Sequence, residues 1–260
     1  MKPRLGLPTD IEAVTDVILR TMPLDPQWDY RFPYRQDYPE DHYKFTRLLF
    51  EYFLDPAYDD WQVMVVEDNL EPGCEERRVV SFSVWDVSYR NKRRYGPSYV
   101  PQDRKSFITL IYSLLHRYHL LSDTPRERGG RTRRDANHEH FQEFWRGQIK
   151  AYKRFFGIFG PEQIHLQILA TLPEFQRRGH ASSLCKWGMK LAHQERLQDI
   201  SVMASPMGYG LYTWLGFGSV GTFYIQVPGE EERLTLQAMK YVPNMKVLRA
   251  VTDNGQCALM

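Results

Sequence analysis

Cysteine and long apolar runs are two features that this chain of 260 residues has little of. Its three cysteines, Cys74, Cys185 and Cys257, are odd in number and far apart, which argues against a disulfide framework and against a metal site. No stretch of about 18 apolar residues is present, which excludes a typical membrane-spanning helix. Residues 1–9 lack the apolar core of a signal peptide, so we expect a cytoplasmic protein with no membrane partner.

A surplus of charge of one sign is also missing. The 34 Lys and Arg residues face 32 Asp and Glu residues, which leaves a net charge of +2 and no reason to expect a polyanionic partner. One basic run, Arg126 to Arg134, suggests nucleic-acid binding, but it contains no interleaved aromatic residues and acidic residues flank it. We therefore interpret it as a solvated, mobile loop and expect no nucleic-acid partner.

The pattern that is present alternates between strands and helices, which predicts a mixed α/β fold with helices on both sides of one sheet. We expect a single domain over 1–260, in which the segment 89–157 interrupts the sheet pattern as a helical insertion. The expected strands are 3–7, 61–67, 79–88, 163–171, 200–204, 217–227 and 234–242; the expected helices begin after Asp10 and cover about 40–54, 107–121, 136–156, 181–196 and 207–215, and 23–38 is expected to be a loop.

A glycine-containing loop between a strand and a helix is the first candidate site. Residues 176–181 read Gln-Arg-Arg-Gly-His-Ala, and the next residues begin a helix. Small residues let a ligand approach the backbone, and a helix N-terminus offers unpaired N–H groups and a partial positive charge. The loop is neither a P-loop nor a dinucleotide fingerprint, because it lacks the Gly-Lys-Ser/Thr sequence and the further glycines. It therefore predicts an anion site suited to a pyrophosphate.

A second motif follows one strand–helix unit later, in the sequence MASPMGYGLYTWLGF over 203–217. Together, Gln176, Gly179 and Ala181, followed by Tyr212, Gly216 and Phe217, resemble the two motifs of the GCN5-related N-acetyltransferase family. The strong part of this resemblance covers about 163–243, and the wording around Tyr212 is similar to a fungal branch of the family. The resemblance implies a mixed, mostly antiparallel central sheet with helices on both faces and acetyl-CoA as the acyl donor.

The family resemblance also assigns roles on the donor side. Leu169, Ala170 and Thr171 would hydrogen-bond the pantetheine arm, and Tyr212 would protonate the CoA thiolate. The Asn that often precedes this Tyr by seven residues is Ser205 here, a departure that puts one contact to CoA in doubt. The pyrophosphate would be bound by the loop residues Gln176, Arg177, Arg178, Gly179, His180, Ala181 and Ser182.

Acylation of an amine also needs a group that removes a proton, because an alkylammonium has a pKa of about 10. His165 stands where histone acetyltransferases of the family have a glutamate base. It would share a strand face with residues 167, 169 and 171 unless the bulge common in this family's strand reverses the alternation. Glu162, Asp86 and Gln167, acting through water, are the alternatives.

The acceptor side is the least specified by sequence. The aromatic stretch with Trp28, Tyr30 and Phe32 is the candidate wall for a compact amine, and the segment 89–157 is a second candidate wall, lid or subunit contact. We expect acetyl transfer to the primary amine of a small molecule, by a monomer or homodimer. A protein or peptide N-acetyltransferase and a non-catalytic CoA-binding protein are the alternatives.

Overall fold

A seven-stranded sheet forms the centre of the computed structural model, which describes residues 2–69, 76–99 and 133–243. The strand order is β1-β2-β3-β4-β5-β7-β6, and β4 and β5 are parallel neighbours whereas the other described pairs are antiparallel. This is the mixed, mostly antiparallel sheet that the sequence predicts. The strands are β1 Arg4–Leu5, β2 Trp61–Asn69, β3 Arg77–Asp86, β4 Gln163–Thr171, β5 Asp199–Ala204, β6 Gly218–Ile225 and β7 Leu234–Tyr241.

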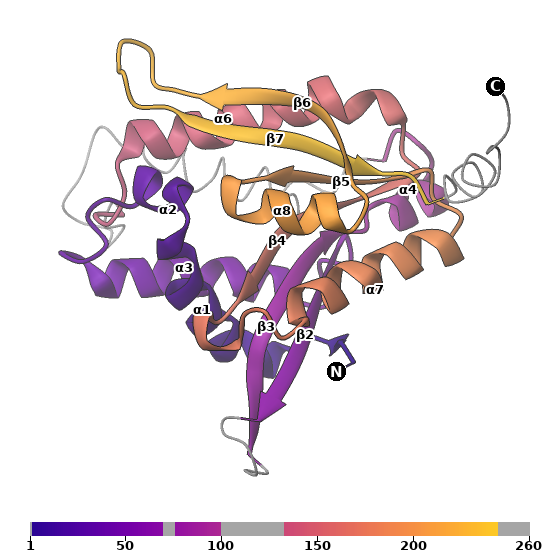
Figure 1. The fold of residues 1–260 in the computed structure, drawn as a ribbon, viewed down its shortest axis with the longest axis horizontal. Helices are drawn as coiled ribbons and strands as arrows, with labels where there is room; N and C mark the ends of the chain where they lie inside the picture. Colours follow the sequence, from indigo (N-terminus) through magenta and orange to yellow (C-terminus); the bar gives the residue numbers. More distant parts are fainter. Residues whose placement is uncertain (1, 70–75, 100–132, 244–260) are drawn as a thin grey trace, which may run out of the picture.

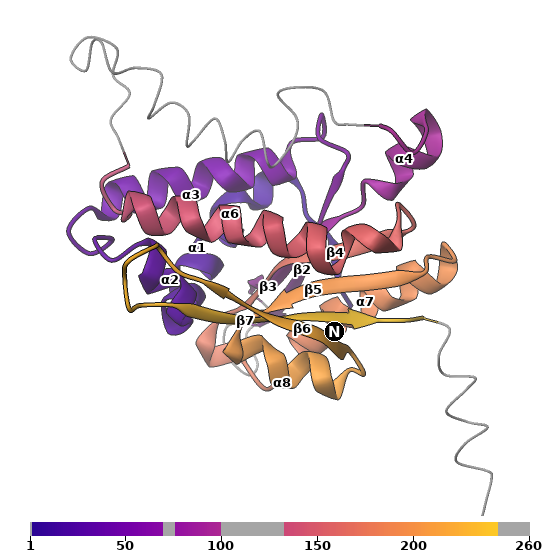
Figure 2. The same cartoon turned by 90° about the horizontal axis from the view of Figure 1, so that it is seen from above.

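Helices cover both faces of this sheet, as expected (Figures 1 and 2). We call the side packed by α1, α2, α3 and α6 the α6 face, and the side packed by α7 and α8 the α7 face. The helices are α1 Ile11–Thr21, α2 Pro26–Arg31, α3 Pro39–Leu54, α4 Tyr89–Tyr95, α6 His138–Phe155, α7 His180–Gln194 and α8 Pro206–Trp214; short 3-10 turns lie at Pro8–Asp10, Met22–Leu24, Gly157–Phe159 and Pro173–Phe175.

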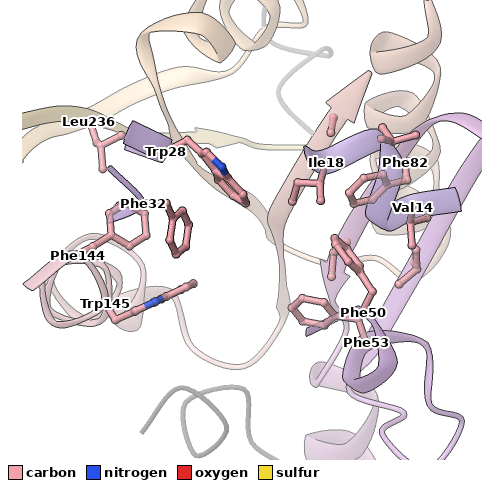
Figure 3. Packing of buried hydrophobic residues seen from close by; sticks show 14 of the residues in the cluster. Val14, Ile18, Trp28, Phe32, Phe50, Phe53, Phe82, Phe144, Trp145 and Leu236 are labelled. Atoms are coloured by element: carbon pink, nitrogen blue, oxygen red, sulfur yellow. The ribbon is translucent and has the colours of Figure 1, made fainter. Parts of the chain in front are cut away.

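The core of the α6 face is strongly aromatic (Figure 3). Trp28 and Phe32, from α2 and its C-terminal end, gather with Phe144 and Trp145 of α6. The core of the α7 face contains Trp85 of β3, and α7 comes so close to it that a Cβ on Gly188 would lie 2.3 Å from the Trp85 ring. The high aromatic content of the sequence therefore goes largely into packing.

Helix α6 comes from the segment 89–157 and packs closely on β6. A Cβ on Gly147 of α6 would lie 2.8 Å from Ile225, and a Cβ on Gly221 of β6 would lie 2.5 Å from Phe155. Such reciprocal close contacts require glycine at both positions. The segment thus supplies part of the main core, and its interpretation as an insertion stays a prediction. Residues 107–121, expected to be helical, lie outside the described residues.

One local expectation is wrong, because the stretch 23–38 is not only loop. Pro26–Arg31 forms α2, with Asp25 as its N-cap accepting a hydrogen bond from the Gln27 amide and Pro26 in the first turn. An N-cap aspartate followed by proline is an ordinary helix-start signal. The shortness of the helix hid that signal among prolines and aromatic residues.

Candidate active site

Strands β4 and β5 pair over only part of their length, and this leaves an open edge in the sheet. The parallel register joins Gln163–Leu166 to Asp199–Val202 and stops there. Beyond it, Met203 and Ala204 pair only with β7, and residues 168–171 pair with β3 alone. The backbone groups in residues 168–171 that face β5 therefore lack a strand partner on that side, although the Thr171 carbonyl accepts a hydrogen bond from Gln176.

A bulge at Gln167 changes which side chains of β4 share a face. Leu166 is opposite Trp85 and Ile168 is opposite Val84, so Gln167 has no partner on β3. Before the bulge, the His165 ring lies on the α6 face; after it, Leu169 packs on the α7 face. His165 therefore does not share a face with residues 169 and 171, because the extra residue reverses the alternation; this is the bulge that the sequence left open.

The loop after β4 ends in a helix N-terminus that no side chain caps. Arg177 has a φ of 63° and Gly179, the N-cap of α7, has a φ of 90°. Glycine adopts this left-handed conformation without strain, and it brings no side chain to the first amides of the helix. The amides of residues 180–182 have no acceptor within the helix at a first turn, so they and the positive end of the helix dipole are open to an anion.

The side chains of this loop mostly hold the backbone in place. Gln176 donates from Nε2 to the Thr171 carbonyl at 3.2 Å, which ties the loop to the end of β4. His180 is buried, and its Nε2 lies 3.1 Å from Asp68 of β2, so only its main chain is available to a ligand. Arg178 stacks on Phe175 at 4.7 Å, Arg177 is exposed at the rim, and Ser182 is partly buried.

Tyr212 lies on α8, buried in the core of the α7 face against which Leu169 packs. Burial raises the pKa of Tyr212 well above its ordinary value, and the Cys185 thiol and the Asp25 carboxylate add to that rise. Within the described chain its hydroxyl makes no hydrogen bond. A phenol that keeps its proton and has no protein acceptor is suited to donating that proton to a ligand. Ser205 is the N-cap of α8.

His165 is fully enclosed on the α6 face. Its Nδ1 lies 2.9 Å from the Ser201 hydroxyl, and the rings of Tyr152 and Phe156 of the α6 region pack against it. Burial lowers the pKa of His165 to about 3. Moving a proton from an ammonium of pKa about 10 to such a group costs roughly 10 kcal/mol, which weighs against His165 as the base.

The three alternatives to His165 lie in different surroundings. Glu162 is ion-paired with Arg93 at the surface. Gln167 is the bulge residue itself, partly exposed. Asp86, opposite His165 in the β3–β4 register, is half-buried and accepts a hydrogen bond from the Ser88 amide at 2.8 Å. Of these, Asp86 is the carboxylate nearest in register to the start of the open edge.

The predicted acceptor residues are inside the molecule. Trp28, Tyr30 and Phe32 are all almost fully buried. The indole of Trp28 donates to His42 Nε2 at 3.1 Å, and Tyr30 stacks on His140 at 4.0 Å. The structure thus gives each of them a protein partner, and their role in binding an acceptor stays a prediction.

A buried chain of polar groups fixes the segment that precedes α6. Because the Trp28 N–H can only donate, His42 Nε2 accepts, and its Nδ1 donates to Asp135 at 2.6 Å. Asp135 also accepts two hydrogen bonds from Arg133, at 2.8 and 2.9 Å. Arg133 is therefore buried and neutralised, which corrects the expectation that the whole run from Arg126 to Arg134 is solvated; Arg126 to Thr132 lie outside the described residues.

Two buried charges on α2 were not recognised from the sequence. Asp25 and Arg31 are only 6% and 7% exposed, and neither forms an ion pair within the described part of the chain. Their burial follows from α2 packing against α6 and β7, a tertiary contact. An N-cap aspartate is visible in the sequence, but its lack of a cationic partner is not.

Comparison with known proteins agrees with this geometry. Over 69 residues the chain is 30% identical to a protein named acetyltransferase from the fungus Stachybotrys chartarum; the match covers 26% of this chain and 30% of that relative, so most of the relative lies outside it. A mosquito arylalkylamine N-acetyltransferase-like protein superposes with a TM-score of 0.53 and 12% identity, covering 92% of this chain and 98% of that one.

A polyamine N-acetyltransferase from Drosophila melanogaster superposes equally well, with a TM-score of 0.53, 12% identity and the same coverage of 92% and 98%. The chain has the fold of the GCN5-related N-acetyltransferases. The first motif that resembles this family lies between β4 and α7, and the second lies on α8 and in the turn to β6. No family model matches the sequence.

The described residues contain neither a membrane-spanning helix nor a cluster of metal ligands. No described helix combines the length and the apolar character that crossing a bilayer would need. Among residues 2–69, 76–99 and 133–243, no group of three or more His, Cys, Asp or Glu side chains is placed to hold a metal ion.

Proposed function

We propose that the protein is an acetyl-CoA-dependent N-acetyltransferase that moves an acetyl group directly to the primary amine of a small molecule while both substrates are bound. The observation that carries this proposal is the uncapped N-terminus of α7 that follows the open edge of β4, with Tyr212 in the core of the α7 face against which Leu169 packs. The two superposing structures named after polyamine and arylalkylamine acceptors support a small amine.

On the donor side, the residues fit the shape and charge of CoA. The amides of His180, Ala181 and Ser182 would bind the pyrophosphate, with Arg177 adding charge at the rim. The backbone of Leu169 to Thr171 would hydrogen-bond the pantetheine arm as a neighbouring strand does. Acetyl-CoA itself supplies the activated acetyl group.

The transfer is a direct displacement. The amine nitrogen forms a bond to the acetyl carbonyl carbon, the carbon–sulfur bond breaks, and the leaving thiolate takes the Tyr212 proton. The phenol, whose raised pKa keeps it protonated, regains a proton from solvent. Overall, one ammonium and one thioester give one amide, one thiol and one released proton.

The proton on the incoming ammonium must leave before attack. His165 was the first candidate for this step, and its lowered pKa makes water leading to Asp86 the better proposal. The packing of Tyr152 and Phe156 over His165 also favours a small acceptor over a peptide chain at this point of the sheet.

Release of free thiol from acetyl-CoA, measured with a panel of polyamines, aromatic amines, amino acids and aminoglycosides, tests the proposal. We expect release with at least one amine and a 10–100-fold lower turnover in Tyr212→Phe, because that variant loses the acid but keeps the ring. Tyr209→Phe is the matched control, since Tyr209 lies on the same helix and is 41% exposed. Tight acetyl-CoA binding without thiol release with any amine would favour a non-catalytic CoA-binding protein.

A further inference from the structure

Asp25 is a buried carboxylate that the fold leaves without a cation. Its Oδ1 accepts the Gln27 amide at 3.2 Å as the N-cap of α2, and no lysine, arginine or histidine of the described residues lies within ion-pair distance. The Asp25 carboxylate also acts on the Tyr212 phenol, whose pKa it helps to raise, so the two side chains are close enough to interact electrostatically.

Arg31, at the other end of α2, is a buried guanidinium without a carboxylate. Its Nε donates to the Gln27 carbonyl at 3.0 Å, and its Cζ lies 4.1 Å from the centre of the Phe144 ring. The rings of Trp28 and Phe32 also face it, at 5.0 and 5.1 Å. Burial and the nearby charge of Arg133 lower the pKa of Arg31 to about 9.

Arg133 is a buried arginine of the same core whose charge is paired with a carboxylate. It faces Phe32 at 4.2 Å, as Arg31 does, but two of its nitrogens donate to Asp135. Arg31 also lies among aromatic rings, of which it shares Phe32 with Arg133, but it has no such carboxylate among the described residues. The aromatic rings orient its guanidinium and exclude water, which makes a carboxylate from a ligand the natural partner.

The two charges interact only at a distance: Asp25 partly offsets the fall in the pKa of Arg31, but the two groups form no ion pair. Asp25 and Arg31 are at opposite ends of α2, about 9 Å apart along its axis, and they make no ion pair. The helix therefore presents a separated anion and cation, both buried, on the element that packs between α6 and β7. Such an arrangement is complementary to a molecule that carries an ammonium and a carboxylate together.

We propose that the acceptor is an amino acid, whose ammonium group lies against Asp25 beside the reaction centre and whose carboxylate is bound by Arg31. This proposal rests on the acetyl transfer proposed above and narrows its substrate class. Asp25 binds the amine, and Arg31 sets the distance between the amine and the carboxylate.

The test compares each amino acid with the amine that differs from it only by loss of the carboxylate, for example phenylalanine with phenethylamine and lysine with cadaverine. A second series contains ω-amino acids of increasing length. In the wild type we expect kcat/KM to be about 10–100-fold higher for the best amino acid than for its carboxylate-free partner, the usual effect of a buried charged hydrogen bond. The opposite preference would overturn the proposal.

Arg31→Met keeps the length of the side chain and removes its charge. We expect it to lower kcat/KM for the amino acid by about 10–100-fold and to change the carboxylate-free amine by less than about threefold. Arg31→Lys, which keeps the charge, should recover part of the loss. Equal losses with both kinds of amine would mean that Arg31 acts only in packing, and would overturn the proposal.

A wild-type measurement covers the case in which the variants do not fold. A carboxylic acid that lacks the amine, such as 3-phenylpropionate, should inhibit competitively against the amine, and its amide should not. Inhibition by acid and amide alike contradicts the proposal. If thiol is released with carboxylate-free amines but not with amino acids, only the amino-acid acceptor is refuted. If no amine gives thiol release, the acetyltransferase function itself is refuted.

Discussion

Gly208 lies under the ring of Tyr212, one helical turn earlier on α8: a Cβ at position 208 would be 2.8 Å from Tyr212 Cε2. The absent side chain at 208 therefore sets the position of the proposed acid. The orientation of Tyr212 depends on its own helix as well as on the core of the α7 face.

Gly208→Ala should consequently reduce catalysis by moving the Tyr212 ring. We expect kcat to fall about tenfold or more, because a displacement of about 1 Å from a reactive geometry can cost up to 100-fold, while acetyl-CoA affinity stays the same. Gly210→Ala is the control, since nothing lies within 4 Å of a Cβ there. If steady-state kinetics give the wild-type kcat for both variants, the position of the Tyr212 ring does not matter for catalysis.

Gly179→Ala tests the anion site at α7. A Cβ has room, with Ser182 Oγ at 3.8 Å, but the φ of 90° is strained for alanine by roughly 1–2 kcal/mol, and relief of that strain reorients the first amides. We expect acetyl-CoA to bind about tenfold more weakly in calorimetric titration. Gly229→Ala has the same φ of 90° and open space in the β6–β7 turn, so it should cost stability and leave acetyl-CoA binding unchanged.

His165 should contribute a pH dependence to stability. Burial lowers its pKa to about 3, so the unfolded chain, in which this pKa is about 6.5, binds the proton more readily. The contribution of neutral His165 is complete above pH 6.5 and is lost as the pH falls towards 3, by about 1.4 kcal/mol per pH unit. Urea unfolding should show wild type losing about 2 kcal/mol more than His165→Asn between pH 7 and pH 5.

The same variant tests the proton-transfer assignment. If His165 stays neutral because it is buried, His165→Asn should keep the acidic limb of the pH–rate profile of kcat/KM where it is. A limb that flattens in the variant would instead identify His165 as the base. Asp86→Asn, measured alongside, should weaken or shift that limb under the proposal made above.

Asp135→Asn should destabilise the protein strongly. The substitution keeps the shape of the side chain but removes its charge. That charge neutralises buried Arg133 and accepts the hydrogen bond from His42. Breaking one side of a buried ion pair costs about 3–5 kcal/mol. Arg134→Gln is the control: it removes the neighbouring pair with Asp41, in which Arg134 is exposed, so a far smaller loss is expected in thermal or urea unfolding.

The sequence determined the order and type of most described elements and the place of the donor site. The strand at 163–171, the helix after Gly179 and the position of Tyr212 follow from local signals: apolar alternation, a left-handed glycine and the spacing of two motifs. These signals act over a few residues, so they can be recognised without knowing which strands meet.

Only the tertiary structure decided the acceptor side. Cross-strand pairing with β3 places the bulge at Gln167, and the reversed alternation puts His165 under Tyr152. The packing of α2 between α6 and β7 buries Asp25 and Arg31. Register and burial depend on residues far away in the chain, and for that reason the local sequence around 25–31 shows a helix start but not two buried charges that form no ion pair within the described residues.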